Sequence, residues 1–139
     1  MAAQAQEIKQ ASPGGSRPVA GSPVYPLGSR VNDRGHLEVG GCDAVELAAE
    51  FGTPAYVYVD ADIRSRARAY LDAFRARTDD FEVIYASKAA PITAILRLLA
   101  DEGLGVDVAS GGELYLALRA GFDPGRCLLY TSPSPRDRS

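Results

Sequence analysis

Short apolar runs alternate with longer amphipathic segments through most of this chain, and that order restricts its fold more than any other feature. Strands and helices in regular alternation form parallel sheets, because each parallel connection has to cross back over the sheet. Such crossovers are right-handed and place the helices outside the sheet. The sequence therefore predicts an α/β fold. The expected strands are 53–60, 81–86 and 105–110, and the expected helices are 60–77, 91–103 and 111–121.

Helical periodicity marks the inward faces of the first two of these helices. Apolar residues three or four positions apart lie on one face of a helix. In the segment 60–77, this face consists of Ile63, Ala67, Tyr70, Leu71 and Phe74. In the segment 91–103, it consists of Ile92, Ile95, Leu96 and Leu99, with Pro91 in the first turn and Gly103 ending the helix.

The segment before this alternation has a different composition. Residues 1–30 are rich in Ala, Gly, Ser and Pro and have little apolar surface to bury, so they are expected to be disordered. A short strand is expected at 35–41, with His36 exposed at its edge rather than catalytic. Asp43 then has the character of a helix N-cap, and Glu46 completes a capping-box pattern.

The last residues depart from the alternating pattern. Residues 127–131 have the composition of one more strand, but CLLYTSPSPRD (127–137) resembles, residue for residue, a translated sequencing adapter of the transposase type. We therefore interpret 127–139 as a translated adapter rather than a native strand and polar tail. A partial domain is then expected at 31–126.

Charge and composition exclude several classes of function. The chain has 15 Lys and Arg against 18 Asp and Glu, and no basic stripe with interleaved aromatic residues, so nucleic acid is not an expected partner. No apolar run approaches the roughly 18 residues that span a bilayer, and the N-terminus lacks the apolar core of a signal peptide. Cys42 and Cys127 have no metal-ligand spacing. We expect a soluble cytoplasmic protein without a bound metal or a membrane partner.

Two charged residues stand where parallel α/β proteins place their sites, at the carboxyl ends of strands. Lys88 follows the first of these strands in EVIYASKAAP, and a partly desolvated amine there can react covalently with an aldehyde. Its small neighbours leave room for a flat cofactor. Asp107 lies near the end of the next strand, so the two side chains could converge. The pattern alone leaves open that both residues simply face solvent.

Glu113 has two interpretations. In SGGE, Ser110 and Glu113 form a capping box before an apolar helix, which explains both residues without a ligand. The paired glycines could instead let a ligand approach the backbone, and the helix N-terminus could hold an anion. Capping alone is the simpler interpretation of the pattern.

Three stretches, in this order, resemble the start of the diaminopimelate decarboxylases: GGCDAVELAAEFGTPAYVYVDADIRSRARAY, YASKAAP and GLGVDVASGGELYLALRAGFDP. That family belongs to the fold-type III pyridoxal-phosphate enzymes, together with ornithine and arginine decarboxylases and alanine racemase. The resemblance runs from about residue 35 to 126. It implies the N-terminal portion of a (β/α)8 barrel that binds pyridoxal 5′-phosphate. The strand and helix before the barrel would belong with a β-domain built from both chain ends.

The resemblance also implies roles for the candidate residues. Lys88 matches the lysine that holds pyridoxal phosphate covalently, and Asp107 and Glu113 match acidic residues near the cofactor. The implied reaction is decarboxylation of meso-2,6-diaminopimelate to L-lysine, the last step of lysine biosynthesis, by a homodimer. Ornithine or arginine decarboxylation and racemisation remain alternatives. A non-catalytic carrier of the cofactor is a further alternative, but such a barrel has no use for the lead-in at 40–54.

A complete barrel takes roughly 250 residues, so this chain is expected to supply only part of one. Parallel strands need neighbours on both sides, and an open sheet edge invites aggregation. We therefore expect the chain by itself to be neither active nor a stable fold. The inward apolar side chains expected to remain incompletely buried are Tyr70, Phe74, Leu96, Leu99, Leu114 and Leu118.

Overall fold

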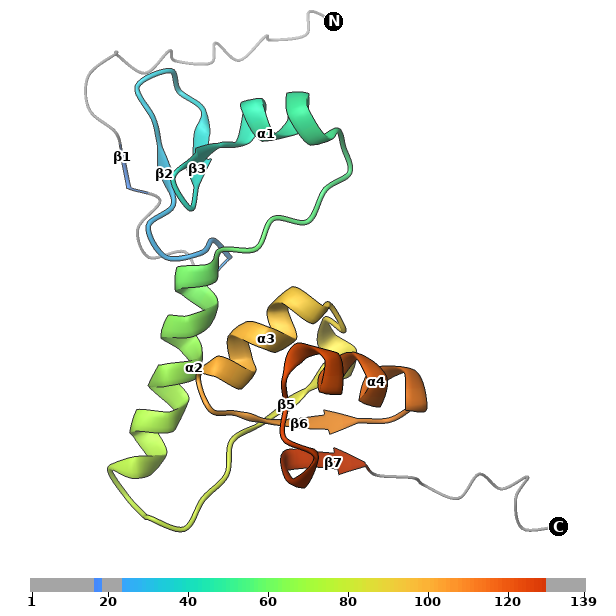
Figure 1. Cartoon of the computed structure of the whole chain (residues 1–139). Helices are drawn as coiled ribbons and strands as arrows, with labels where there is room; N and C mark the ends of the chain where they lie inside the picture. The colour runs from blue at the N-terminus through green and yellow to red at the C-terminus, as the bar shows by residue number, and fades with distance from the viewer. Residues whose placement is uncertain (1–16, 19–23, 130–139) are drawn as a thin grey trace, which may run out of the picture. The chain divides into compact units, whose positions relative to one another are not determined.

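The computed structural model describes residues 17–18 and 24–129 (Figure 1). The chain divides into two compact units, Met1–Val59 and Asp60–Ser139. In its described part, the first unit is a small antiparallel sheet with one helix. The second unit alternates strands and helices, as the sequence predicts.

The first unit is built from four short strands in the order β1-β2-β3-β4, each antiparallel to its neighbour. The strands are β1 (Arg17–Pro18), β2 (Arg30–Val31), β3 (Leu37–Val39) and β4 (Cys42–Asp43). Val39 pairs with Cys42 across a turn made by Gly40 and Gly41. Both glycines have positive φ, +59° and +84°, as the tight turns of two-residue hairpins require. The strand predicted at 35–41 is therefore shorter, because its glycines form turns.

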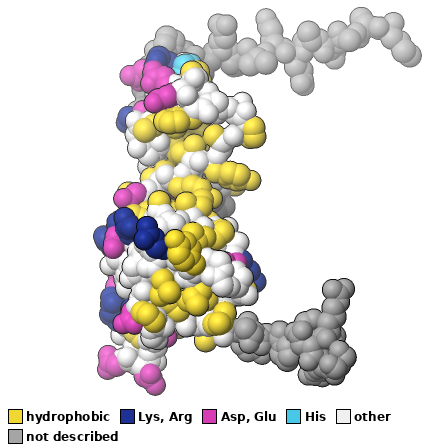
Figure 2. Space-filling model, turned by 45° about the vertical axis from the view of Figure 1, so that its right-hand side comes forward, with side chains coloured by type: hydrophobic (Ala, Val, Ile, Leu, Met, Phe, Trp, Pro, Cys, Tyr) yellow, Lys and Arg dark blue, Asp and Glu magenta, His cyan; other side chains and the backbone are white. Residues whose placement is uncertain are grey.

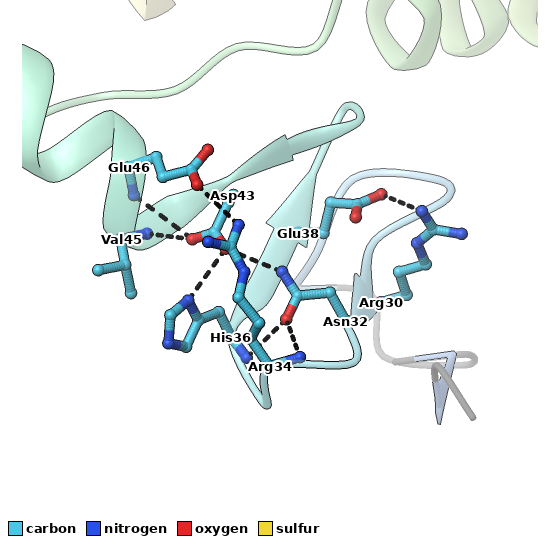
Figure 3. Close-up of polar contacts among 8 residues, drawn as sticks. All are labelled: Arg30, Asn32, Arg34, His36, Glu38, Asp43, Val45 and Glu46. Carbon is cyan, nitrogen blue, oxygen red and sulfur yellow. Dashed lines mark hydrogen bonds and ion pairs between the residues drawn. The ribbon is translucent and has the colours of Figure 1, made fainter. Parts of the chain in front are cut away.

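Helix α1 (Ala44–Phe51) begins at Asp43, as predicted. Asp43 Oδ1 accepts hydrogen bonds from the backbone N–H groups of Val45, at 2.8 Å, and Glu46, at 3.4 Å (Figure 3). Glu46 does not close a capping box: its carboxylate accepts a hydrogen bond from Arg34 Nη2 at 2.7 Å instead. Arg34, from a neighbouring loop, thus replaces the N-cap backbone N–H that the capping-box pattern predicts as the partner of Glu46.

Asp43 also ties this loop to the helix. Its Oδ2 lies 2.8 Å from Asn32 Nδ2 and 2.9 Å from His36 Nδ1 (Figure 3). Burial raises the pKa of Asp43, but the hydrogen bonds from Asn32, His36 and the helix N-terminus outweigh it and hold that pKa well below its usual range. His36 is half-buried against Asp43, so the expectation of an exposed histidine is wrong. The contact gives His36 a structural partner.

Two predictions about the first unit differ from the structure. Disorder was expected through residue 30, whereas Arg17–Pro18 pairs with β2 and Ser29 is buried, with its hydroxyl donating to the Pro26 carbonyl at 2.8 Å. The rest of that prediction, over 1–16 and 19–23, lies outside the described residues. The predicted strand at 53–60 is absent: among the described residues no strand pairs with 56–59, and Tyr56 is 91% exposed. Strand-forming side chains do not make a strand without a neighbour for its backbone.

Residues 60–129, the described part of the second unit, form three helices and a three-stranded parallel sheet in the order β5-β6-β7. Its helices are α2 (Asp60–Arg75), α3 (Thr93–Asp101) and α4 (Gly111–Ala120). Its strands are β5 (Ile84–Ala86), β6 (Gly105–Val108) and β7 (Cys127–Leu129). Single 3-10 turns at Ser87–Ala89 and Pro124–Arg126 follow β5 and precede β7. The α/β class and the parallel pairing follow the prediction.

One face of this sheet carries the core. Val106 and Val108 of β6 are fully buried, as is Leu96 of α3. Tyr85 and Cys127, which pair with Val106 from the two neighbouring strands, are partly buried against the same cluster. Successive side chains of a strand point to opposite faces. Asp107, between two buried valines, therefore points to the face that this core does not cover.

Helix α2 buries only part of its apolar face, which confirms the expectation that Tyr70 and Phe74 remain incompletely buried. In α2, Ala67 and Leu71 are buried, but Tyr70 is 63% and Phe74 47% exposed. Helix α2 packs on α3, which covers only the centre of the apolar stripe, and Phe74 stacks instead on Phe81, with the ring centroids 5.7 Å apart. Figure 2 shows hydrophobic side chains at the surface on the face in view.

Helix α3 begins two residues later than predicted, with Ile92 as its N-cap, so Pro91 lies outside its first turn and Ile92 is exposed. Gly103 follows the helix with φ +85°, as expected of its end. Leu96 and Leu99 are buried, contrary to the expectation that too little sheet would cover them.

The predicted boundary at residue 126 falls just before β7. Residues 127–129 pair in parallel with 106–108 of β6, the register expected of one more strand–helix–strand unit. Residues 130–139 lie outside the described residues. The adapter interpretation of 127–139 stays a prediction, because almost any apolar run after α4 could add to the open edge of β6.

Candidate functional site

Lys88 lies at the carboxyl end of β5, in the 3-10 turn Ser87–Ala89. Its side chain is exposed, while Ser87 before it is fully buried and Ala90 after it is buried. The turn is closed by the Ala90 N–H, which donates to the Ser87 carbonyl at 3.1 Å. The backbone around Lys88 is therefore embedded in the protein while its amine remains accessible.

Asp107 belongs to the same edge of the sheet. It pairs in register with Ala86 of β5, two residues before Lys88. Its side chain is half-buried and points away from the core face formed by Val106 and Val108. The structure thus brings Lys88, which follows β5, and Asp107, in the neighbouring β6, to one edge of the sheet, as predicted. It forms no ion pair between them in the described part of the chain.

Glu113 reaches this edge from the first turn of α4. Its backbone N–H donates to Ser110 Oγ at 3.2 Å, which is the predicted N-cap. Its carboxylate does not bond the Ser110 N–H: Oε2 accepts the Ala109 N–H at 2.7 Å and the Ser87 hydroxyl at 3.0 Å. The capping box is therefore half formed, and its glutamate joins the ends of β5 and β6.

Ser87 is the residue that the sequence interpretation missed. It was assigned only as a small neighbour that leaves space beside Lys88. Its complete burial demands a hydrogen-bond partner for the hydroxyl, and Glu113 supplies that partner. A serine between a strand and a candidate lysine was the only signal available, and it does not identify the partner.

The largest electrostatic perturbation of the second unit lies at the other end of the sheet, where α3 leads into β6. Glu102 accepts hydrogen bonds from Arg68 and Arg64 of α2. These two arginines lower the pKa of Glu102 to about 2. Because this cluster joins α2 to α3 and lies away from Lys88, we assign it to the packing of the helices.

Neither a candidate metal site nor a membrane-spanning helix occurs among the described residues. No group of three or more His, Cys, Asp or Glu within them could hold a metal ion. No helix within them is long and apolar enough to cross a membrane.

The residues at the carboxyl end of the sheet fit an aldehyde cofactor such as pyridoxal phosphate. Lys88 offers an exposed primary amine, and Ala86 and Ala89 beside it add no bulk. The half-buried Asp107 places a carboxylate on the uncovered face of the next strand. An accessible amine is the group that covalent binding of such an aldehyde requires, and the Lys88 side chain supplies it.

Comparison with known proteins identifies the class of this fold and site. Residues 60–137 match the family described as "Pyridoxal-dependent decarboxylase, pyridoxal binding domain". The match covers the whole parallel sheet together with Lys88, Asp107 and Glu113. The chain belongs to this family, which confirms the resemblance predicted from its motifs.

Individual relatives indicate which members of this family the chain is similar to. The chain is 51% identical over 107 residues to the diaminopimelate decarboxylase of Methanothermobacter thermautotrophicus, covering 77% of this chain and 25% of that protein. It is 52% identical over 94 residues to the diaminopimelate decarboxylase of Bacillus methanolicus, covering 68% and 22%.

Solved structures agree with this similarity. A crystal structure of a Methanocaldococcus jannaschii diaminopimelate decarboxylase matches with a TM-score of 0.68 and 38% identity, over 73% of this chain and 24% of that one. A second structure of this enzyme, in co-complex with L-lysine, matches with a TM-score of 0.67. The chain thus spans about a quarter of the length of the curated relatives and solved structures that it matches.

Proposed function

We propose that this chain contributes the cofactor-anchoring part of a pyridoxal-phosphate-dependent decarboxylase that converts meso-2,6-diaminopimelate to L-lysine. The observation that carries the proposal is the exposed Lys88 amine at the end of β5, within a segment about half identical to diaminopimelate decarboxylases. The structural match to a relative in complex with L-lysine supports the same substrate class. A complete (β/α)8 barrel, assembly as a homodimer and a cytoplasmic location are part of this proposal.

Lys88 Nζ is the proposed point of attachment for the cofactor. It has to be unprotonated to attack an aldehyde, and its exposure leaves it open to that approach. When bound, pyridoxal phosphate supplies the electron sink that makes loss of carbon dioxide feasible. The protein's task is to hold the amine and the substrate in a fixed geometry.

Asp107 and Glu113 are proposed to support this site in different ways. Asp107 presents a carboxylate on the uncovered face of the sheet, next to the strand that leads to Lys88. A fixed negative charge there favours a nearby cation, which includes a protonated substrate amine. Glu113 uses its carboxylate to connect the two strand ends.

The attachment site can be tested on the 139-residue chain, because it contains only two lysines, Lys9 and Lys88. The chain is incubated with pyridoxal 5′-phosphate, reduced with sodium borohydride and digested, and the pyridoxyl label is mapped by mass spectrometry. Lys9 serves as an internal control, and Lys9→Arg and Lys88→Arg as matched variants. We expect the label mainly on Lys88 and its loss in Lys88→Arg alone. Equal labelling of both lysines would contradict the assignment.

The substrate is tested on the complete protein that contains this chain. Release of carbon dioxide from meso-2,6-diaminopimelate, ornithine and arginine is compared under the same conditions. A preference for ornithine or arginine, or racemisation without release of carbon dioxide, would replace the proposed reaction by one of the alternatives within the superfamily.

A further inference from the structure

We propose that Ser87 is a positioning residue for Lys88, acting through its hydrogen bond to Glu113. The proposal rests on the proposed function, because it assigns to these residues the task of orienting the amine that holds the cofactor. It gives Glu113 a role that neither the capping pattern nor proximity to a cofactor describes. The carboxylate would act on Lys88 by fixing the residue next to it.

The contact joins two segments that are 26 residues apart in the sequence. The Ser87 hydroxyl donates to Glu113 Oε2 at 3.0 Å, and the same oxygen accepts the Ala109 N–H at 2.7 Å. Ala109 immediately follows β6, and Ser87 immediately follows β5. One carboxylate oxygen therefore clamps the ends of both strands at the edge where Lys88 emerges.

A single side-chain hydrogen bond reaches the turn that carries Lys88 in the described part of the chain. Within the described part of the chain, no other side chain forms a hydrogen bond to the residues of the turn Ser87–Ala89. The backbone bond from Ala90 to Ser87 closes the turn, and the pairing of Ala86 with Asp107 anchors its start to β6. The Ser87–Glu113 bond is therefore the side-chain hydrogen bond that ties this turn to the end of the neighbouring strand.

The chemistry of the clamp requires an acceptor at residue 113. Both partners, an O–H and a backbone N–H, donate, and an ionised carboxylate accepts without a proton of its own. A glutamine can also accept both bonds through its carbonyl oxygen, whereas alanine accepts neither. If Glu113 were needed for its charge, glutamine would fail; if it is needed as an acceptor, glutamine will serve.

The experiment compares four variants of the 139-residue chain. Ser87→Ala and Glu113→Ala remove the clamp, and Glu113→Gln keeps its acceptor. Ser110→Ala is the matched control, because it removes the helix N-cap made to the Glu113 N–H and leaves the Ser87–Glu113 bond in place. All measurements are made with the same concentration of trimethylamine N-oxide, which favours the compact state, at a temperature where the circular dichroism of each variant equals that of the parent.

The first readout needs no cofactor. Hydrogen exchange of the Ala109 amide should be about tenfold faster or more in Ser87→Ala, since the Glu113 side chain, no longer restrained by the Ser87 hydroxyl, is freer to leave the Ala109 N–H. Ser110→Ala should change it much less. Equal acceleration by Ser87→Ala and Ser110→Ala would reduce the contact to ordinary helix stabilisation and overturn the proposal.

The second readout is the ratio of pyridoxyl label on Lys88 to that on Lys9. This ratio should fall about tenfold or more in Ser87→Ala and Glu113→Ala, because a displaced reactive group loses most of its advantage. It should remain within about twofold of the parent in Glu113→Gln and Ser110→Ala. Acetylation by acetic anhydride, which needs no oriented amine, should give the same ratio in all variants.

The two readouts distinguish failure of the positioning proposal from failure of the proposed attachment site. An unchanged labelling ratio in Ser87→Ala, or a fall in Glu113→Gln as large as in Glu113→Ala, would refute positioning through the hydrogen bond. Should the parent chain itself label Lys88 no more than Lys9, the proposed attachment site fails. Amide exchange at Ala109 then still tests whether Ser87 and Glu113 hold the two strand ends together.

Discussion

Replacement of Leu96 by alanine tests whether the core of the second unit exists as described. Leu96 is 0% exposed and packs in the cluster that contains Val106 and Val108. Truncating a buried leucine to alanine costs about 2–5 kcal/mol, because the lost transfer free energy adds to that of the cavity left behind. Leu118 of α4 provides the matched control: it undergoes the same chemical change on a helix, but it is 43% exposed.

The losses of unfolding free energy expected for Leu96→Ala and Leu118→Ala differ enough to be resolved. Because Leu118 already contacts solvent, we expect its truncation to cost about 1 kcal/mol or less. For a urea dependence of about 1–3 kcal/mol per molar, a loss of about 3 kcal/mol lowers the midpoint by about 1–3 M. The change in helix propensity from leucine to alanine is small and common to both variants.

The assay is urea unfolding of the 139-residue chain followed by circular dichroism at 222 nm. A complete small domain has only about 5–15 kcal/mol to lose, and this chain, as part of a barrel, is expected not to be stable by itself. All titrations therefore contain the same concentration of trimethylamine N-oxide, which favours the compact state. Leu96→Ala should abolish or strongly shift the transition, and Leu118→Ala should nearly preserve it. Equal shifts in the two variants would refute the described core.

Three further predictions concern the charge cluster, the activity and the tail. Arg64 and Arg68 hold the pKa of Glu102 at about 2, below its ordinary 4.5, so the stability it contributes is present above about pH 4.5 and is lost as pH falls towards 2. Thermal unfolding of Glu102→Gln should therefore change less between pH 5 and pH 2 than that of the parent, and parallel curves would contradict this. The 139-residue chain should release no carbon dioxide from diaminopimelate, since it spans about a quarter of its relatives; measurable turnover would contradict this. Sequencing the gene without transposase-based adapters should replace residues 127–139 by a different sequence, and recovery of the same codons would refute the adapter interpretation.

Capping residues in the sequence correctly predicted where two helices begin. Asp43 and Ser110 cap α1 and α4 as expected, because an N-cap needs only the backbone of the next turn. The strand expected at 53–60, within the described part of the chain, is absent for the converse reason. Its residues favour an extended backbone, but strand pairing depends on a neighbour that the local pattern does not contain.

The candidate site shows the same division between local and distant partners. Strand ends and register follow from the alternation of strands and helices, so the placement of Lys88 and Asp107 at one edge of the sheet was predictable. The partner of a side chain is not predictable in this way. Glu46 and Glu113 stand at equivalent places in two capping-box patterns, yet each carboxylate bonds a residue from another segment.

The register of the sheet explains why Glu113 finds Ser87. Ala86 and Asp107 pair across β5 and β6, so the chain just beyond each of them emerges at the same edge. A buried hydroxyl there requires an acceptor, and the first turn of α4 starts three residues after β6 ends. A glutamate that would otherwise close its own helix cap gains more by bonding a buried donor than an exposed one, because leaving the buried group unpaired costs the full desolvation penalty. A capping-box pattern placed directly after a parallel strand therefore predicts its cap residue reliably, while the distant partner of its glutamate follows only from the fold.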